Sequence, residues 1–90
     1  SNSFVESGNA LYFAGMSAQK LGQDEKANEA FEQFLVVAPN DKKADDIKCT
    51  LAVSYQKAGN KAKAVEYYQQ ILTNPKYTEV AKAQIAALGK

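Results

Sequence analysis

The chain has 90 residues, enough for one small domain that buries roughly 60–65% of its unfolded surface. Hydrophobic residues make up 46% and charged residues 23% of the chain, an ordinary globular composition. The net charge is +1, and Arg, His and Trp are absent. This balance argues against a nucleic-acid-binding protein. It also excludes His-based catalysis, His metal sites and bidentate Arg clamps on phosphate.

Two further function classes are disfavoured by simple counts. The single cysteine, Cys49, can form neither an internal disulfide nor a multi-Cys zinc site. No apolar run approaches the ~20 residues that a membrane span needs, so no membrane insertion by this segment is expected. The chain starts at Ser1 without Met, which is consistent with an excised or processed piece in which Ser1-Asn2 is a cloning remnant.

The first half of the chain predicts two helices. Ala, Glu, Gln, Lys and Leu are abundant between the breakers, and these residues favour helix. The first helix is expected over about residues 4–21, and Gly22 supplies a left-handed C-cap. Asp24 is expected to cap the second helix, which continues to about residue 37 and is broken by Pro39.

The second half predicts three more helices. Asp41 is a candidate N-cap for the third helix, which stops at Gly59. Asn60 is expected to cap the fourth helix, which ends at Asn74-Pro75, and the last helix covers about residues 77–88. Sustained period-two alternation, the signal of strands, is absent from the sequence. Because every connection is short, neighbouring helices should pack antiparallel.

Each predicted helix carries an apolar stripe at helical spacing. In chain order, the predicted core positions are Phe4, Leu11, Ala14, Gly15 and Ala18; Ala27, Phe31, Phe34 and Leu35; Ala44, Ile47, Leu51, Ala52 and Tyr55; Ala64, Val65, Tyr68, Ile71 and Leu72; and Val80, Ala81, Gln84, Ile85 and Leu88.

An internal repeat organises these helices. Shifting the chain by 37 residues aligns residues 19–35 with residues 56–72, and eight of these seventeen positions are identical. The identities include Gly22/Gly59 and Ala27/Ala64. A helix–turn–helix unit repeated at this length is typical of an α-solenoid.

The repeated positions resemble the tetratricopeptide repeat (TPR) family. The residues that carry the resemblance are Leu11, Ala14-Gly15, Ala18, Ala27, Phe31 and Pro39 in the first copy, and Lys48, Leu51-Ala52, Tyr55, Ala64, Tyr68 and Pro75 in the second. Small residues would allow the two helices of a hairpin to cross closely, and Phe31 and Tyr68 would fill the gap to the following repeat. The leading aromatic residue of the family pattern is absent from both copies, and Ala18 replaces its Tyr.

The resemblance implies an all-α fold, an α-solenoid of antiparallel helix–turn–helix hairpins. It implies one domain over residues 1–90, with repeat 1 at about 4–39, repeat 2 at about 41–75 and a C-terminal capping helix at about 77–88. The long period is similar to that of bacterial envelope scaffolds. The resemblance therefore leaves the bacterial periplasm or cell envelope and the cytoplasm as alternative compartments.

The same resemblance implies a non-catalytic module that binds a protein or peptide in a concave groove. The first helix of each hairpin lines such a groove, and the residues rotated off its packing stripe are the partner-binding candidates. The strongest candidates are Asn9, Tyr12, Met16, Gln19, Lys20, Cys49, Val53, Gln56 and Lys57. Val5 and Asp46 lie on the same faces. The family's carboxylate clamp is not expected, because Tyr12, Met16 and Thr50 occupy the corresponding positions.

A second interpretation stays open beside the groove. Val5, Tyr12 and Met16 could instead pack on further repeats or on another copy of the chain, which would make the chain a structural or oligomerising piece. An enzyme ranks third. Cys49 lacks a neighbouring His and lies in mid-helix, which favours an unreactive thiol. The carboxylates of Asp41, Asp45 and Asp46 are expected to favour a helix start rather than to bind a cation. No cofactor or metal is expected.

Overall fold

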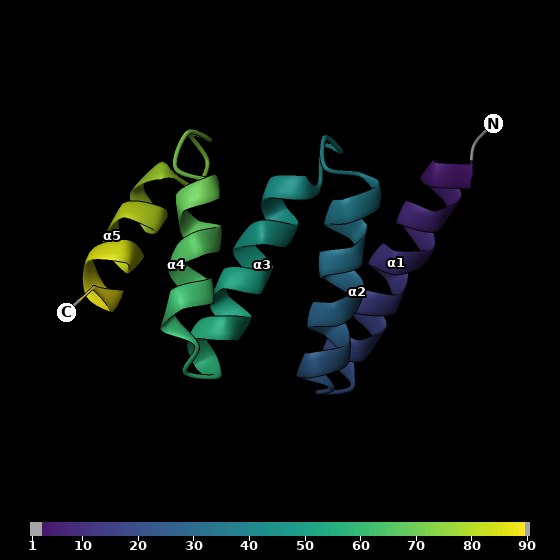
Figure 1. Cartoon of the computed structure of the whole chain (residues 1–90), viewed down its shortest axis with the longest axis horizontal. Coiled ribbons are helices and arrows are strands. Elements are labelled where there is room, and N and C mark those ends of the chain that lie inside the picture. The colour runs from purple at the N-terminus through teal and green to yellow at the C-terminus, as the bar shows by residue number, and fades with distance from the viewer. Residues whose placement is uncertain (1–2, 90) are drawn as a thin grey trace. The chain divides into compact units, whose positions relative to one another are not determined.

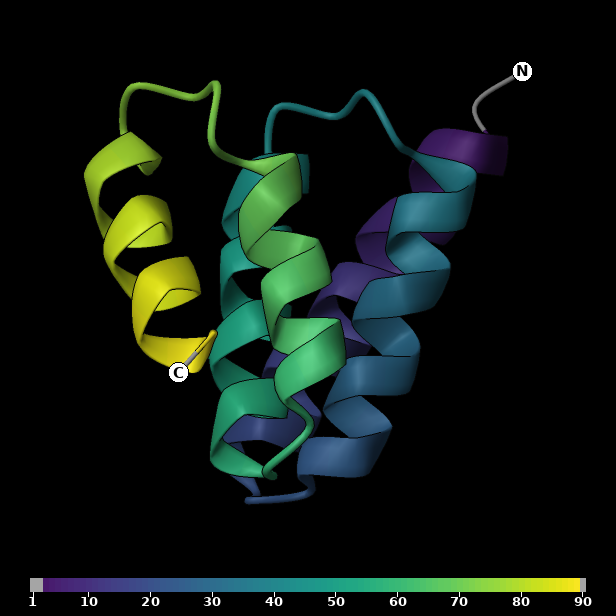
Figure 2. The same ribbon diagram turned by 60° about the vertical axis from the view of Figure 1, so that its left-hand side comes forward.

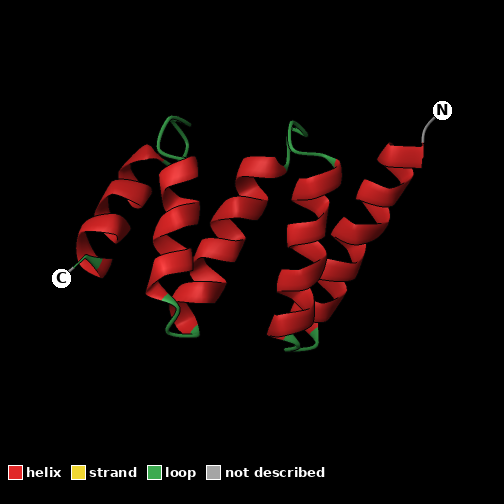
Figure 3. Cartoon of the chain, in the orientation of Figure 1, coloured by secondary structure: helices red, strands yellow, loops and turns green. Residues whose placement is uncertain are grey.

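The structure is a computed structural model that describes the backbone of residues 3–89 and the side chains of residues 7–89. These residues form five α-helices and no strand (Figures 1 and 3). The helices are α1 (Ser3–Lys20), α2 (Asp24–Val37), α3 (Ala44–Lys57), α4 (Lys61–Gln70) and α5 (Thr78–Leu88). The side chains of Phe4 and Val5, and residues Ser1 and Asn2, lie outside the described residues.

The chain comprises two compact units, Ser1–Ala44 and Asp45–Lys90. The first unit contains the antiparallel pair α1 and α2, and the second contains α3, α4 and α5 (Figure 1). The all-α class, the number of helices in the described residues and the order of the hairpins agree with the sequence-based expectations.

The two hairpin turns are built alike. Gly22 has φ +72° and Gly59 has φ +84°, the left-handed conformation that glycine adopts without steric cost. The N–H of Gln23 donates to the carbonyl of Ala18 at 2.9 Å, and the N–H of Asn60 donates to the carbonyl of Tyr55 at 2.9 Å. The predicted glycine caps are confirmed, and the repeat seen in the sequence is a repeat of turn geometry.

The turns that precede α3 and α5 also share one geometry. Asp41 Oδ1 accepts a hydrogen bond from the N–H of Lys43 at 2.8 Å, and Asn74 Oδ1 accepts one from the N–H of Lys76 at 3.0 Å. Each side chain thus bonds the backbone two residues on, which stabilises the turn. Asp41 therefore serves the turn before α3 rather than capping the helix itself, which begins at Ala44.

The first unit is held together by two buried phenylalanines on α2. Phe31 is 1% exposed and Phe34 is 0% exposed. Gly15 of α1 lies against the Phe31 ring, because a Cβ added at Gly15 would come within 2.5 Å of Phe31 Cε1. Gly8 lies about two helical turns earlier on the same side of α1. A Cβ added at Gly8 would lie 3.6 Å from the Phe34 ring, which is an ordinary contact distance. Glycine at position 15 is therefore what lets α1 approach α2 so closely.

The second unit has a core of its own, formed by α3, α4 and α5 (Figure 2). Its buried residues are Ala52, Ala64, Tyr68, Ile71 and Ala81. Cys49, Tyr55, Tyr67, Leu72, Tyr77, Ile85 and Leu88 pack around them, half-buried. Ala64 is 0% exposed, as Ala27 at the equivalent position is 3% exposed, so both repeats place a small residue in the core.

Two helix ends differ from the expectations. The structure ends α4 at Gln70 rather than at Asn74, because the N–H of Ile71 turns back to the carbonyl of Tyr68, three residues away. Such bonds tighten a last turn to 3₁₀ geometry and terminate the α-helix. At the start of α2, Asp24 is already helical and Gln23 is the N-cap without a side-chain bond. The predicted Asp24 cap is wrong, whereas Asn60 caps α4 as predicted, accepting from the N–H of Lys63.

Two predicted core positions are wrong as well. Ala14 of α1 is exposed, and Val80 of α5 is 43% exposed. On α1 the residues that complete the buried face are instead Gly8, which is buried, and Tyr12, which is half-buried. The stripe on α1 is therefore rotated toward residues 8, 12 and 15, which follow one another at four- and three-residue spacings.

We expect Gly15→Ala to lower the free energy of unfolding by about 1–3 kcal/mol, because the new methyl group overlaps the buried Phe31 ring. Gly8→Ala is the matched control on the same helix. Its methyl group meets Phe34 at ordinary contact distance, so the better helix propensity of alanine should stabilise the protein by up to about 1 kcal/mol. Urea unfolding followed by circular dichroism measures both. Equal effects of the two substitutions would contradict the close crossing at Gly15.

Candidate functional site

The structure leaves most predicted α1 candidates accessible. Asn9, Gln19 and Lys20 are exposed, and Met16 is 37% exposed. Asn9, Met16 and Lys20 follow one another at seven- and four-residue spacings, so they share one face of α1. Phe13, which the sequence did not single out, is 67% exposed and lies beside this face, three residues before Met16. The three-residue spacing between Phe13 and Met16 was the signal in the sequence that could have identified Phe13 as a neighbour of this face.

Tyr12 does not lie off the packing stripe, as the sequence suggested. Its ring centroid is 6.4 Å from that of Phe31 and 6.3 Å from that of Phe34, so Tyr12 covers the aromatic core of the first unit. The Nζ of Lys43 lies 5.3 Å from the Tyr12 ring centroid, within range of a cation–π interaction. Tyr12 is half-buried. The ring therefore supports the hairpin and is only partly accessible.

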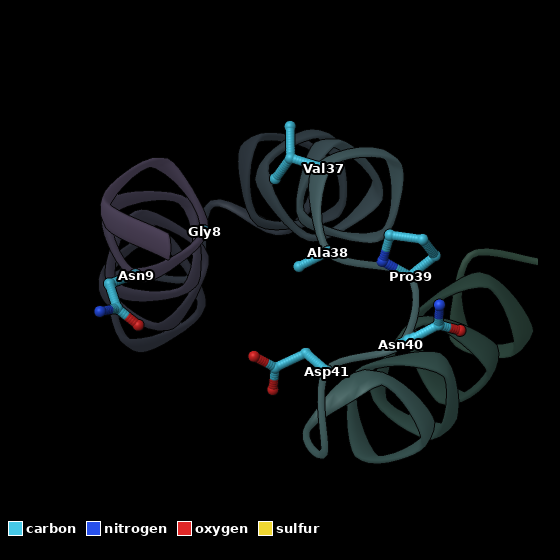
Figure 4. Close-up of a pocket in the computed structure, with 7 residues that line it drawn as sticks. All are labelled: Gly8, Asn9, Val37, Ala38, Pro39, Asn40 and Asp41. Carbon is cyan, nitrogen blue, oxygen red and sulfur yellow. The ribbon is translucent and has the colours of Figure 1, made fainter. Parts of the chain in front are cut away.

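A pocket of about 320 Å³ opens at one end of this hairpin. Its walls are Gly8 and Asn9 of α1, Val37 of α2, and the turn residues Ala38, Pro39, Asn40 and Asp41 (Figure 4). In Figure 4 the side chains of Ala38 and Asp41 point into the space beside Gly8. Only Asn9 among these residues was a sequence-based candidate.

The charge in the pocket is balanced locally. Asp41 Oδ1 lies 3.4 Å from Lys43 Nζ. The pKa of the Asp41 carboxyl is lowered, first because the backbone N–H of Lys43 donates to it and then because of the lysine charge. Asp41 is thus held ionised while its neighbour offsets the charge. A mainly apolar wall with three polar residues, Asn9, Asn40 and Asp41, suits a protein side chain rather than a free ion.

In the second unit, the candidates on α3 divide into two groups. Val53 is 38% exposed and Lys57 is exposed. Cys49 instead packs against the core of the unit, and burial, followed by the charge of Asp46, raises the pKa of its thiol. A raised pKa keeps the sulfur protonated and unreactive at neutral pH. Cys49 therefore offers packing rather than covalent chemistry.

Gln56 was expected at the rim of a groove, and the structure places it inside the second unit. Tyr68 Oη donates to Gln56 Oε1 at 2.9 Å, and Gln56 Nε2 donates to Gln84 Oε1 at 2.8 Å. This chain of hydrogen bonds joins α4, α3 and α5 and satisfies the hydroxyl of the buried Tyr68. A side chain committed in this way stabilises the second unit, so Gln56 is left out of the candidate binding surface described below.

The acidic start of α3 is bound to the connection between α4 and α5. Asp45 Oδ2 accepts from Asn74 Nδ2 at 2.9 Å. Asp46 Oδ1 accepts from Lys76 Nζ at 3.0 Å and also from the Tyr77 hydroxyl. The pKa of Asp46 is lowered, first by the Tyr77 hydrogen bond and then by that of Lys76. These carboxylates anchor a loop, in addition to their favourable place at a helix N-terminus.

Across residues 7–89, no three Cys, Asp or Glu side chains gather in a group that could hold a metal ion. None of the described helices is long and apolar enough to cross a bilayer.

Because the pKa of Asp46 is lower in the folded state, its carboxylate stabilises the fold above pH ~4, the unfolded value, and this contribution is lost as the pH falls further. We expect the free energy of unfolding to decline from pH ~5 to pH ~3, and to decline less in Asp46→Asn. Tyr77→Phe should also reduce the decline, because it removes the strongest donor to Asp46. Urea titrations across this range measure the slopes. Variants that reproduce the wild-type slope would contradict this role of Asp46.

Comparison with known proteins agrees with this architecture. Residues 9–41 and 50–76, more than half of the chain, match the tetratricopeptide repeat family. No curated protein and no solved structure is significantly similar to the chain. The matched segments contain the two glycine turns and the paired core positions Ala27/Ala64 and Phe31/Tyr68. The chain therefore belongs to the tetratricopeptide repeat family, with two repeats followed by the closing helix α5.

Proposed function

We propose that the chain is a non-catalytic interaction module in which each repeat binds a protein segment along the exposed face of its first helix, α1 in the first unit and α3 in the second. Tetratricopeptide repeat modules generally act as protein–protein interaction scaffolds. The binding surface that we propose consists of Asn9, Met16 and Lys20 on α1, and of Val53 and Lys57 on α3. We call these two sets of residues the first-helix faces.

One observation carries the proposal. Met16 and Val53 occupy equivalent positions in the 37-residue repeat, and they are 37% and 38% exposed. Both repeats therefore keep an apolar side chain partly in water at the same place, although neither contributes to the buried core. An apolar residue retained in the same setting twice is what a binding face needs, because it adds contact area when a partner covers it.

The pocket beside Asn9 supports the same conclusion in the first unit. It adjoins the α1 face through Gly8 and Asn9, and Val37, Ala38 and Pro39 give it an apolar wall. A bound segment that runs along α1 can insert one side chain there, and the Asp41 carboxylate, which points into the space (Figure 4), accepts hydrogen bonds from a donor on that side chain. Binding through one anchor and a short face should be of modest affinity.

The test compares two charge-matched double variants. Met16→Asp/Val53→Asp places carboxylates on both first-helix faces. Val36→Asp/Val80→Asp makes the same change at two other exposed valines, which are 80% and 43% exposed. All four positions are partly exposed, so both proteins should keep the wild-type circular dichroism. We expect Val36→Asp/Val80→Asp to capture the same partner proteins from the source cells as the wild type does. We expect Met16→Asp/Val53→Asp to capture none of them. Retention by both variants, or loss by both, would refute the proposed surface.

A second candidate function rests on other exposed apolar residues at α1. Phe13 of α1 and Leu21, which follows the last residue of that helix, are 67% and 72% exposed, and Ala10 and Ala14 of the same helix are also exposed. This apolar side would suit packing on another copy of the chain or on further repeats, which is a structural role. Sedimentation over a range of concentrations separates the two functions. Self-association that Phe13→Glu/Leu21→Glu abolishes would favour the structural role, and a monomer at all concentrations would exclude self-association.

A further inference from the structure

Gly8 is a buried glycine in the interior of α1 that helix packing does not require. A Cβ added at Gly8 would lie 3.6 Å from the Phe34 ring and 3.8 Å from Ala38 Cβ, which are ordinary contact distances. At Gly15, by contrast, the added atom would come within 2.5 Å of the Phe31 ring. Glycine weakens a helix interior relative to alanine, so the glycine at residue 8 calls for a reason other than packing.

The pocket at the end of the first hairpin supplies such a reason. Gly8 forms part of the wall of this space of about 320 Å³, and the Ala38 side chain points toward it from the turn after α2 (Figure 4). A side chain longer than a methyl group at residue 8 would extend toward Ala38 and take up part of the space. All the lining residues belong to the first unit, so the pocket is complete within that unit.

The pocket presents one carboxylate beside an apolar surface. Asp41 points into the space (Figure 4). Among the described residues, the backbone N–H and the Nζ of Lys43 both contact Oδ1 of Asp41, which leaves Oδ2 for a hydrogen-bond donor on a ligand. Val37, Ala38 and Pro39 offer apolar surface to the body of the same ligand. The complementary ligand is therefore apolar along its length, with a donor at its tip.

Charge and size narrow the choice of ligand side chain. An acidic side chain would be repelled by the Asp41 carboxylate, and a basic one would share that carboxylate with the ammonium group of Lys43, 3.4 Å from Oδ1. The short side chains of serine and threonine would leave most of the pocket unfilled. Tyrosine combines a large apolar ring with a hydroxyl donor at its tip, and O–H donors form short, strong hydrogen bonds to carboxylates.

We propose that the pocket receives a tyrosine side chain of a protein segment bound along α1, with the tyrosine hydroxyl donating to Asp41 Oδ2. This inference rests on the proposed function and names the side chain that anchors the segment. Asn9 lies in the pocket wall, and Met16 follows it by seven residues, roughly 10 Å along the helix. An extended chain spans that distance in about three residues, so one short segment reaches both the pocket and the α1 face.

The probes are three synthetic peptides that differ only at the central residue, which is Tyr, Phe or Lys. Each peptide has a leucine three residues to either side of that position, to contact the α1 face. NMR titration of the ¹⁵N-labelled full chain measures their affinities and shows which backbone amides respond. We expect the Tyr peptide to bind about tenfold more tightly than the other two and to shift the amide signals of Gly8 and Asp41. A Phe or Lys peptide that binds as tightly as the Tyr peptide would overturn the inference.

Asp41→Asn tests the carboxylate. Asn74 closes the equivalent turn before α5 with an amide side chain, so asparagine at residue 41 should keep the turn and the fold. We expect this variant to bind the Tyr peptide only as tightly as the Phe peptide. Asp24→Asn makes the same change at an exposed carboxylate at the other end of α2 and should keep the preference for tyrosine. A preference that survives in Asp41→Asn, or is lost in both variants, would refute the role of Asp41.

Substitutions of Gly8 test the space. Gly8→Leu should fill the pocket and abolish the preference for the Tyr peptide, whereas Ala10→Leu, at an exposed position of the same helix, should keep it. Circular dichroism checks that both variants are folded. Gly8→Ala makes a smaller change that the packing accepts, and it should stabilise the fold and weaken the binding of the Tyr peptide. Binding of the Tyr peptide that is undiminished in folded Gly8→Leu or in Gly8→Ala would contradict the proposed pocket.

Failure of the inference and failure of the proposed function give different results. Met16→Asp places a carboxylate on the α1 face and leaves the pocket residues unchanged. If the α1 face binds peptides without selecting tyrosine, Met16→Asp weakens the binding of all three peptides and Asp41→Asn weakens none. That result overturns the tyrosine pocket and keeps the proposed surface. If Met16→Asp binds all three peptides as the wild type does, the segment does not run along the α1 face, and both proposals fail together.

Discussion

The close crossing of α1 over α2 at Gly15 is the contact on which the first unit depends. With no side chain at residue 15, the Phe31 ring occupies the space where a Cβ would lie, and α1 settles near enough for Tyr12 to cover Phe31 and Phe34. The position of Tyr12 in turn places Lys43 over its ring and beside Asp41. The close packing of α1 on α2 therefore depends on the absence of a side chain at residue 15, because well-packed interiors leave no room for an added methyl group.

The second unit reaches the same architecture by different means. It has Ala52 and Tyr68 at the positions of Gly15 and Phe31, and its buried tyrosine brings a hydroxyl group that must be satisfied. Gln56 meets that need and passes a hydrogen bond on to Gln84 of α5. Polar contacts at Asp45 and Asp46 secure the other end of α5. Of the residues of α5, only Ala81 is fully buried, so these hydrogen bonds act together with the apolar contacts of Ala81, Ile85 and Leu88 to dock the helix.

Local rules predicted well those features that depend on a few neighbouring residues. The glycine turns, the Asn60 cap and the alternation of small and aromatic residues on α2 and α4 are of this kind. The features that could not be predicted from the sequence depend on tertiary contacts. Whether Tyr12 faces a partner or covers Phe34, and whether Gln56 meets water or Tyr68, differs by a small rotation of the helix, and periodicity does not resolve such a rotation. The pocket was missed because it combines α1 with a turn some 30 residues later in the sequence.

The shared turn before α3 and before α5 has a consequence for how such a chain can lengthen. Asp41 and Asn74 both close the turn through a bond to the backbone of a lysine two residues later, so each junction starts a new helix with the same type of turn, built on Asp in one case and on Asn in the other. A hairpin copied and inserted at either junction would carry its own start signal and would need no new turn chemistry. The segment that is duplicated is then a hairpin together with the turn that precedes it. An array of such hairpins can lengthen by duplication without a new turn sequence.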